Sequence, residues 1–81
     1  MVDGLFLELL DRFEVEGRNV SHKKNANEYA PKMFADDPKA KDRHVHKDAF
    51  LAAMNRLFAT STIRSENYGP PSRGWSKLVR K

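Results

Sequence analysis

The sequence contains no cysteine and only one tryptophan, with four glycines and four prolines among its 81 residues. Without cysteine there is neither a disulfide framework nor a thiolate zinc site, so apolar packing must stabilise the fold. This absence is typical of a reducing compartment, and we expect a cytoplasmic protein. The longest apolar run, near residues 5–10, is interrupted by Glu8 and is far shorter than the ~20 residues that cross a bilayer. We therefore expect no membrane segment.

Sequence motifs of catalysis and cofactor binding are absent as well. There is no G-x-S-x-G nucleophile elbow and no G-x-x-x-x-G-K phosphate-binding loop. His44 and His46 lie close to Asp42, but their spacing matches no zinc signature. The length allows one small domain, residues 1–81, in which residues 1–3 are open to being a linker. We predict no enzyme activity, no cofactor, no metal site and no small-molecule substrate.

Charge is distributed unevenly along the chain, whose net charge is +4. Residues 1–16 hold five carboxylates and one arginine, whereas the remaining residues hold 14 cations and six carboxylates. Such asymmetry is expected when one face of a protein meets phosphate and the acidic face turns away from it. An ordinary soluble domain with a basic excess is the alternative explanation.

The first third of the chain predicts one helix and a loop. The helix is capped by Asp3, ends at Gly17 and has an apolar side made of Leu5, Phe6, Leu9, Leu10 and Phe13. Residues 18–27 are rich in polar side chains. We expect a loop there, or a brief edge strand around Val20.

The middle of the chain predicts two more helices. A short second helix should open at Pro31, because proline is tolerated in a first turn, and should end at residues 36–38. The highly charged residues 39–44 are predicted to be an exposed connector. A third helix, residues 45–60, has His46 as its N-cap and an apolar stripe of Phe50, Leu51, Met54, Leu57 and Phe58.

Two runs with a period of two follow, residues 63–68 and 75–79, joined by a Gly-Pro-Pro-Ser-Arg-Gly turn at residues 69–74. Ile63 and Leu78 are predicted to seal the open end of the helical core. Helices followed by a ribbon with a basic tip are typical of a winged helix-turn-helix. The predicted fold class is therefore α+β, mostly α: three helices followed by a C-terminal two-stranded β-hairpin wing.

The third helix is predicted to lie in the major groove of double-stranded DNA. Its outward side should carry small or lightly polar side chains, namely Asp48, Ala49, Ala52, Ala53, Asn55, Arg56 and Ala59. Small side chains such as Ala52 let a helix lie deep in the groove, where Asn55 can read adenine and Arg56 guanine. Two such residues discriminate weakly, so DNA shape or oligomerisation would have to add specificity. Helix propensity and an ordinary surface charge are the alternative explanation.

The ribbon and the first loop are predicted to contact DNA phosphates. Together with Lys47 at the start of the third helix, the predicted contacts are Lys23, Lys24, Arg64, Ser72, Arg73 and Lys77. Arg80 and Lys81 add positive charge at the end of the ribbon. The two prolines of the turn stiffen it, which reduces the entropy lost on binding.

Four segments occur in a recognisable order: Gly-Arg-Asn-Val-Ser at 17–21, Asn-Glu-Tyr-Ala-Pro-Lys-Met-Phe at 27–34, Ala-Phe-Leu-Ala-Ala-Met-Asn-Arg-Leu-Phe at 49–58, and Tyr-Gly-Pro-Pro-Ser-Arg at 68–73. They resemble the C-terminal module of RepA-like AAA-family ATPases of prophages and plasmids, and the likeness covers most of the chain from Leu5 onward. It implies a winged-helix appendage of a hexameric RecA-fold motor that acts in DNA replication, with the ATPase core missing from this chain. A winged helix that binds protein instead of DNA, or a free-standing small transcriptional regulator, remains the alternative.

Overall fold

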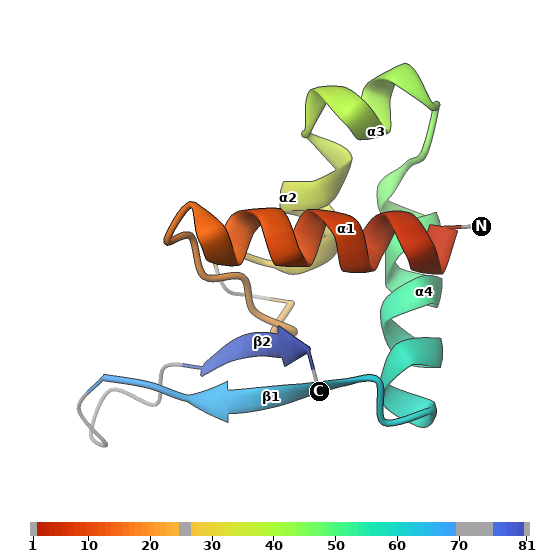
Figure 1. Ribbon diagram of the computed structural model, residues 1–81. Coiled ribbons are helices and arrows are strands. Elements are labelled where there is room, and N and C mark those ends of the chain that lie inside the picture. Colours follow the sequence, from red (N-terminus) through yellow and green to blue (C-terminus); the bar gives the residue numbers. More distant parts are fainter. Residues whose placement is uncertain (1, 25–26, 70–75, 81) are drawn as a thin grey trace.

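The computed structural model describes residues 2–24, 27–69 and 76–80, which form four helices and one two-stranded antiparallel sheet (Figure 1). The elements are α1 (Val2–Val15), α2 (Ala30–Ala35), α3 (Pro38–Asp42), α4 (Lys47–Ala59), β1 (Ile63–Asn67) and β2 (Ser76–Arg80). The fold class is thus α+β and mostly helical, as predicted, but with one helix more than expected. Within these described residues, no helix is long and apolar enough to cross a bilayer.

Helix α1 buries the five predicted apolar residues and ends at a glycine. Gly17 adopts a φ of 74°, a left-handed conformation that glycine takes without strain. The N–H groups of Gly17 and Arg18 donate to the carbonyls of Glu14 and Phe13 over 3.0 and 2.8 Å, which closes the helix as a Schellman motif. The predicted N-cap was wrong. The helix begins at Val2, two residues earlier than an N-cap at Asp3 would place it, so Asp3 lies in its first turn.

Residues 41–44 are exposed, as predicted for the connector over residues 39–44, but residues 38–42 form helix α3, which was not predicted. The Asp37 side chain accepts a hydrogen bond from the N–H of Lys39 over 2.9 Å, and Pro38 occupies the first helical position. Aspartate followed by proline therefore starts a helix here, since the side chain caps it and proline has no N–H to leave unpaired. The prediction treated the same residues only as the end of α2, where proline disfavours helical geometry in the residue before it.

Helix α4 begins after His46, the predicted N-cap, although the imidazole makes no capping hydrogen bond. Its buried side chains are Phe50, Ala53, Met54 and Leu57. The helix ends at Ala59. Ser61, two residues on, has a φ of 59° and donates its N–H to the carbonyl of Phe58 over 3.0 Å. Helix α3 is followed in the same way by His44, with a φ of 56°. Two ordinary residues thus occupy the left-handed position that glycine fills after α1.

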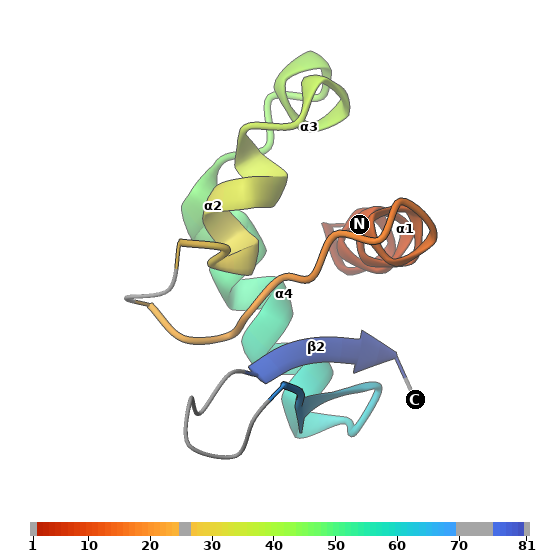
Figure 2. The same cartoon turned by 90° about the vertical axis from the view of Figure 1, so that its left-hand side faces the viewer.

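Strands β1 and β2 form a hairpin beside α1 and α4, with Ile63 paired to Arg80 and Ser65 to Leu78 (Figure 1). Ile63 and Leu78 are both buried, which confirms that they close the helical core. On its other side, β2 meets the segment that leaves α1: the N–H of Leu78 donates to the carbonyl of Val20 over 2.7 Å. Figure 2 shows this segment running along β2. In place of the predicted edge strand around Val20, the described segment has this one hydrogen bond to β2 and an isolated bridge between Ser21 and Tyr29.

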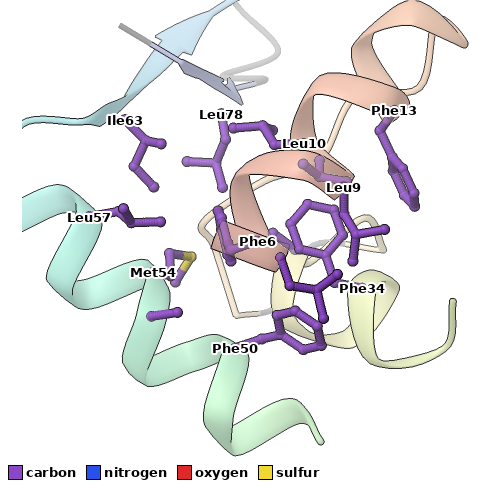
Figure 3. Close-up of a cluster of buried hydrophobic side chains, with 14 of the residues drawn as sticks. Phe6, Leu9, Leu10, Phe13, Phe34, Phe50, Met54, Leu57, Ile63 and Leu78 are labelled. Atoms are coloured by element: carbon purple, nitrogen blue, oxygen red, sulfur yellow. The ribbon is translucent and has the colours of Figure 1, made fainter. Parts of the chain in front are cut away.

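Four phenylalanine rings hold the helices together (Figure 3). The ring centroid of Phe34 in α2 lies 4.9 Å from that of Phe6, 5.2 Å from that of Phe13 and 5.8 Å from that of Phe50, with the rings close to perpendicular. All four side chains are buried, and edge-to-face contacts of this kind add to the gain from burial. The cluster fixes the position of α4 against both α1 and α2.

Candidate nucleic-acid interface

The outer face of α4 is narrower than the sequence predicted. Ala53 is fully buried and Ala49 is half-buried, so neither can present a small side chain to a groove. The reason is that α4 packs against α1 on one side and α2 on the other, so the buried arc is wider than the apolar stripe alone indicates. Ala52 and Asn55 are exposed, as predicted.

Arg56, the predicted guanine reader, is exposed but already engaged. Its Nε donates to Oδ1 and Oδ2 of Asp3 over 3.1 and 3.2 Å, and its Nη2 donates to Oδ1 over 2.5 Å. The hydrogen bonds from Arg56, reinforced by its charge, lower the pKa of Asp3, and the same bonds raise the pKa of Arg56. A ligand that approaches the Nε edge of the guanidinium must displace Asp3.

The outer face of the described part of the hairpin carries a net charge of only +1, from Arg64, Lys77 and Glu66. The register pairs Arg64 with Val79 and Glu66 with Lys77, so these four side chains share the outer face of the sheet. Nη2 of Arg64 lies 3.2 Å from Oε2 of Glu66. Glu66 thus lies beside both predicted phosphate contacts and offsets the charge of one of them.

Helix α1 forms ion pairs with three other elements, contrary to the predicted separation of an acidic side from a basic side. Besides Asp3 with Arg56 of α4, the pairs are Asp11 with Arg80 of β2, Glu8 with Lys39 of α3, and Arg12 with Asp37 at the start of α3. The Arg80 Nη1 lies 2.6 Å from Oδ2 of Asp11. Since α1 crosses α4 and also lies beside β2 (Figure 1), its carboxylates reach cations from distant parts of the sequence.

The loop after α1 keeps both predicted lysines at the surface. Lys23 and Lys24 are exposed, and the N–H of Lys23 donates to Oγ of Ser21 over 3.1 Å. Ser72 and Arg73, predicted for the turn of the hairpin, lie outside the described residues. The structure therefore gathers the described predicted contacts into three places: the loop, the outer face of α4 and the outer face of the hairpin.

Two cations that were not predicted as DNA contacts precede α4 in the chain. Lys41 and Arg43 are exposed beside the predicted contact Lys47, and none of the three forms an ion pair with another described residue. The N–H groups of His44 and Val45 donate to carbonyls of α3 over 3.2 and 2.9 Å, so these cations project from an ordered turn. The charged residues before α4 could have indicated these phosphate contacts. Carboxylates in the same segment reduce its net charge and obscured them.

The described residues contain no group of three histidine, aspartate or glutamate side chains placed to hold a metal ion. Comparison with protein-family models, with curated proteins and with solved structures found no match to this chain. The class of protein therefore has to be argued from its topology and its surface.

Proposed function

We propose that the chain is a winged-helix domain that binds duplex DNA through α4. The observation that carries the proposal is the arrangement around β2, which pairs with β1 on one side and bonds to Val20 on the other. A segment between α1 and α2 that hydrogen-bonds to β2, then α2 and α4 with the short α3 between them, and then the hairpin are compatible with the element order of a winged helix. In that architecture the helix before the hairpin enters the major groove.

The surface of α4 supports the same role. Ala52 and Ala59 leave little bulk on its exposed face, which suits a helix that enters a groove about 12 Å wide. Asn55 offers both a donor and an acceptor for a base edge. Lys41, in α3, and Lys47, at the start of α4, form no ion pair with another described residue and are suited to the flanking phosphates.

The resemblance to RepA-like ATPases supports a role in replication. In this proposal, the domain holds a hexameric RecA-fold motor on duplex DNA in the cytoplasm. The DNA phosphates and the rest of such an ATPase are the partners. No chemistry takes place in this chain, and recognition is entirely non-covalent.

A salt titration tests DNA binding. Fluorescence anisotropy measures the affinity of the protein for a labelled mixed-sequence duplex. If the protein contacts ~4–6 phosphates, this affinity should fall by a factor of about 10²–10³ between 50 and 200 mM salt. The double variant Lys41→Gln/Lys47→Gln should bind all sequences more weakly with a shallower salt slope. Each single variant, Lys41→Gln or Lys47→Gln, is also compared with Arg18→Gln. This control likewise removes one charge, and Arg18 follows the end of α1 that lies away from α4 (Figure 1).

A protein-binding winged helix is the second candidate. The ion pairs of Arg56, Arg64 and Arg80 favour this function. Their carboxylate partners offset the positive charge that each arginine would need to attract a phosphate. The same titration separates the two functions. If the wild-type protein shows no duplex binding at low salt, or binding that does not respond to salt, DNA binding is rejected and the protein-binding role is preferred.

A further inference from the structure

We infer that Asp3 is a specificity-determining residue of the proposed DNA interface, because it directs the Arg56 guanidinium towards base edges and weakens its attraction for phosphate. The inference rests on the proposed function and adds to it a residue from α1, whose acidic side was expected to face away from the phosphates. Asp3 is half-buried in the first turn of α1, whereas Arg56 belongs to the exposed side of α4.

The geometry leaves one edge of the guanidinium available. Asp3 occupies Nε and one hydrogen of Nη2, which leaves Nη1 and the second Nη2 hydrogen of Arg56 without a partner among the described residues. Those remaining donors form the fork that matches O6 and N7 of guanine. Directional donation to a base is therefore retained in the presence of Asp3.

The charge of the pair has a different consequence for phosphate. Attraction to the DNA backbone depends on the net charge that a side chain brings, since binding releases condensed counterions. The carboxylate of Asp3 offsets the charge of Arg56 at hydrogen-bond distance. Arg56 paired in this way adds little to sequence-independent binding, and freeing it adds one phosphate contact.

Packing of the two helices, and not the ion pair itself, sets the separation of Asp3 and Arg56. Leu5 and Phe6 follow Asp3 and are buried against α4, and Leu57 follows Arg56 into the same core. The Arg56 side chain is 49% exposed, and pairs as exposed as this contribute little to stability. Variants of Asp3 should therefore remain folded, which a thermal melt checks.

The substitution Asp3→Asn removes the charge and keeps the size of the side chain. Its control, Glu14→Gln, removes one carboxylate from an exposed position of α1 that has no ion pair within the described residues. Binding is measured on a mixed-sequence duplex and on a panel of duplexes with single guanine changes. Asp3→Asn should bind the mixed duplex more tightly, and a rise from 50 to 200 mM salt should cost it about three to four times more affinity than the wild type.

Three further results decide the inference. The gain should disappear in the Arg56→Gln background, Asp3→Glu should keep the wild-type salt slope, and Asp3→Asn should discriminate less among the guanine panel. If the wild type binds DNA but Asp3→Asn matches Glu14→Gln, or its gain survives in Arg56→Gln, this inference is wrong while the proposed function stands. If neither the wild type nor Asp3→Asn binds duplex at low salt, both are wrong.

Discussion

The backbone N–H of Leu78 donates to the carbonyl oxygen of Val20 over 2.7 Å, which ties the hairpin to the segment that leaves α1. In an antiparallel ladder, the N–H and C=O of one residue point towards the same neighbouring strand. The N–H and C=O of Leu78 therefore both point away from β1. The N–H and C=O of Ser65, which is paired with Leu78, must likewise point away from β2, towards the open edge of the sheet. Two residues that face each other across the hairpin thus have opposite hydrogen-bonding environments.

Amide hydrogen exchange should separate these two residues. The N–H of Leu78 is bonded inside the fold, so its exchange should require an opening that releases the hairpin from Val20. The N–H of Ser65 faces the edge of the sheet and should exchange orders of magnitude faster. Exchange measured by NMR checks this, and equal rates at the two positions would show that the bond to Val20 does not hold β2.

Ser61→Gly should stabilise the protein. Ser61 has a φ of 59° at the end of α4, where an ordinary residue costs about 1–2 kcal/mol, whereas glycine costs only about 0.5–1 kcal/mol through its flexibility in the unfolded chain. We expect a net gain of about 0.5–1 kcal/mol in the free energy of unfolding, measured by urea denaturation.

Gly17→Ala is the matched opposite change at the end of α1. Its φ is 74° and a Cβ there would meet nothing within 4 Å, so only backbone strain opposes the substitution. The free energy of unfolding should fall by about 1 kcal/mol. Should Ser61→Gly and Gly17→Ala change stability in the same direction, left-handed strain is not what controls these helix ends.

Phe34→Ala should remove much of the stability of the domain. The ring of Phe34 contacts those of Phe6, Phe13 and Phe50, and truncation of a buried phenylalanine costs about 3–5 kcal/mol out of a typical total of about 5–15 kcal/mol. Phe58→Ala is the control. That ring is only half-buried, so its truncation should lower the free energy of unfolding by less. Circular dichroism during urea denaturation measures both, and equal costs would contradict the central position of Phe34.

Acid should destabilise the protein through Asp3 and Glu8. Hydrogen bonds from Arg56 and Lys39 lower the pKa of Asp3 and Glu8, respectively, below their ordinary values of 3.8 and 4.5. A carboxyl group with a lower pKa in the folded state contributes stability above its ordinary value, and this contribution is lost as pH falls through the folded value.

The Tm should therefore decline as pH falls below 4.5, and less steeply in Asp3→Asn and Glu8→Gln. High salt should reduce the difference between these variants and the wild type, because both ion pairs are exposed to solvent. Thermal melts over an acid pH series provide the measurement. Curves for the variants that run parallel to the wild type would exclude these two carboxylates as the cause.

The sequence was sufficient to predict α1, α4 and the hairpin. Each helix has an apolar stripe whose period follows from helix geometry, and the alternation after Ser61 identified Ile63 and Leu78 as buried. The predicted number of helices was wrong because the Asp37-Pro38 pair was taken only as the end of α2. The same pair also starts α3. That ambiguity is local, and the capping potential of Asp37 was visible in the sequence.

The arrangement of charge was not predictable in the same way. Asp3 and Arg56 are 53 residues apart, and Asp11 and Arg80 are 69 apart. They meet only because α1 packs across α4 and beside β2, which the linear distribution of charge does not encode. Exposure of Arg56 could be predicted from the helical period, but its engagement by Asp3 could not.

Helix α3 buries only Ala40 and stands apart from the hairpin at the far end of the molecule (Figure 1). The aromatic residues on either side of it, Phe34 and Phe50, are positioned by α2 and α4. Residues 41–44 are exposed, so residues could be inserted there without displacing Ala40 or the ion pair of Lys39 with Glu8. Homologous chains that differ in length should do so here, and grafting a longer segment at this position would extend the reach of the domain while leaving its interior as it is.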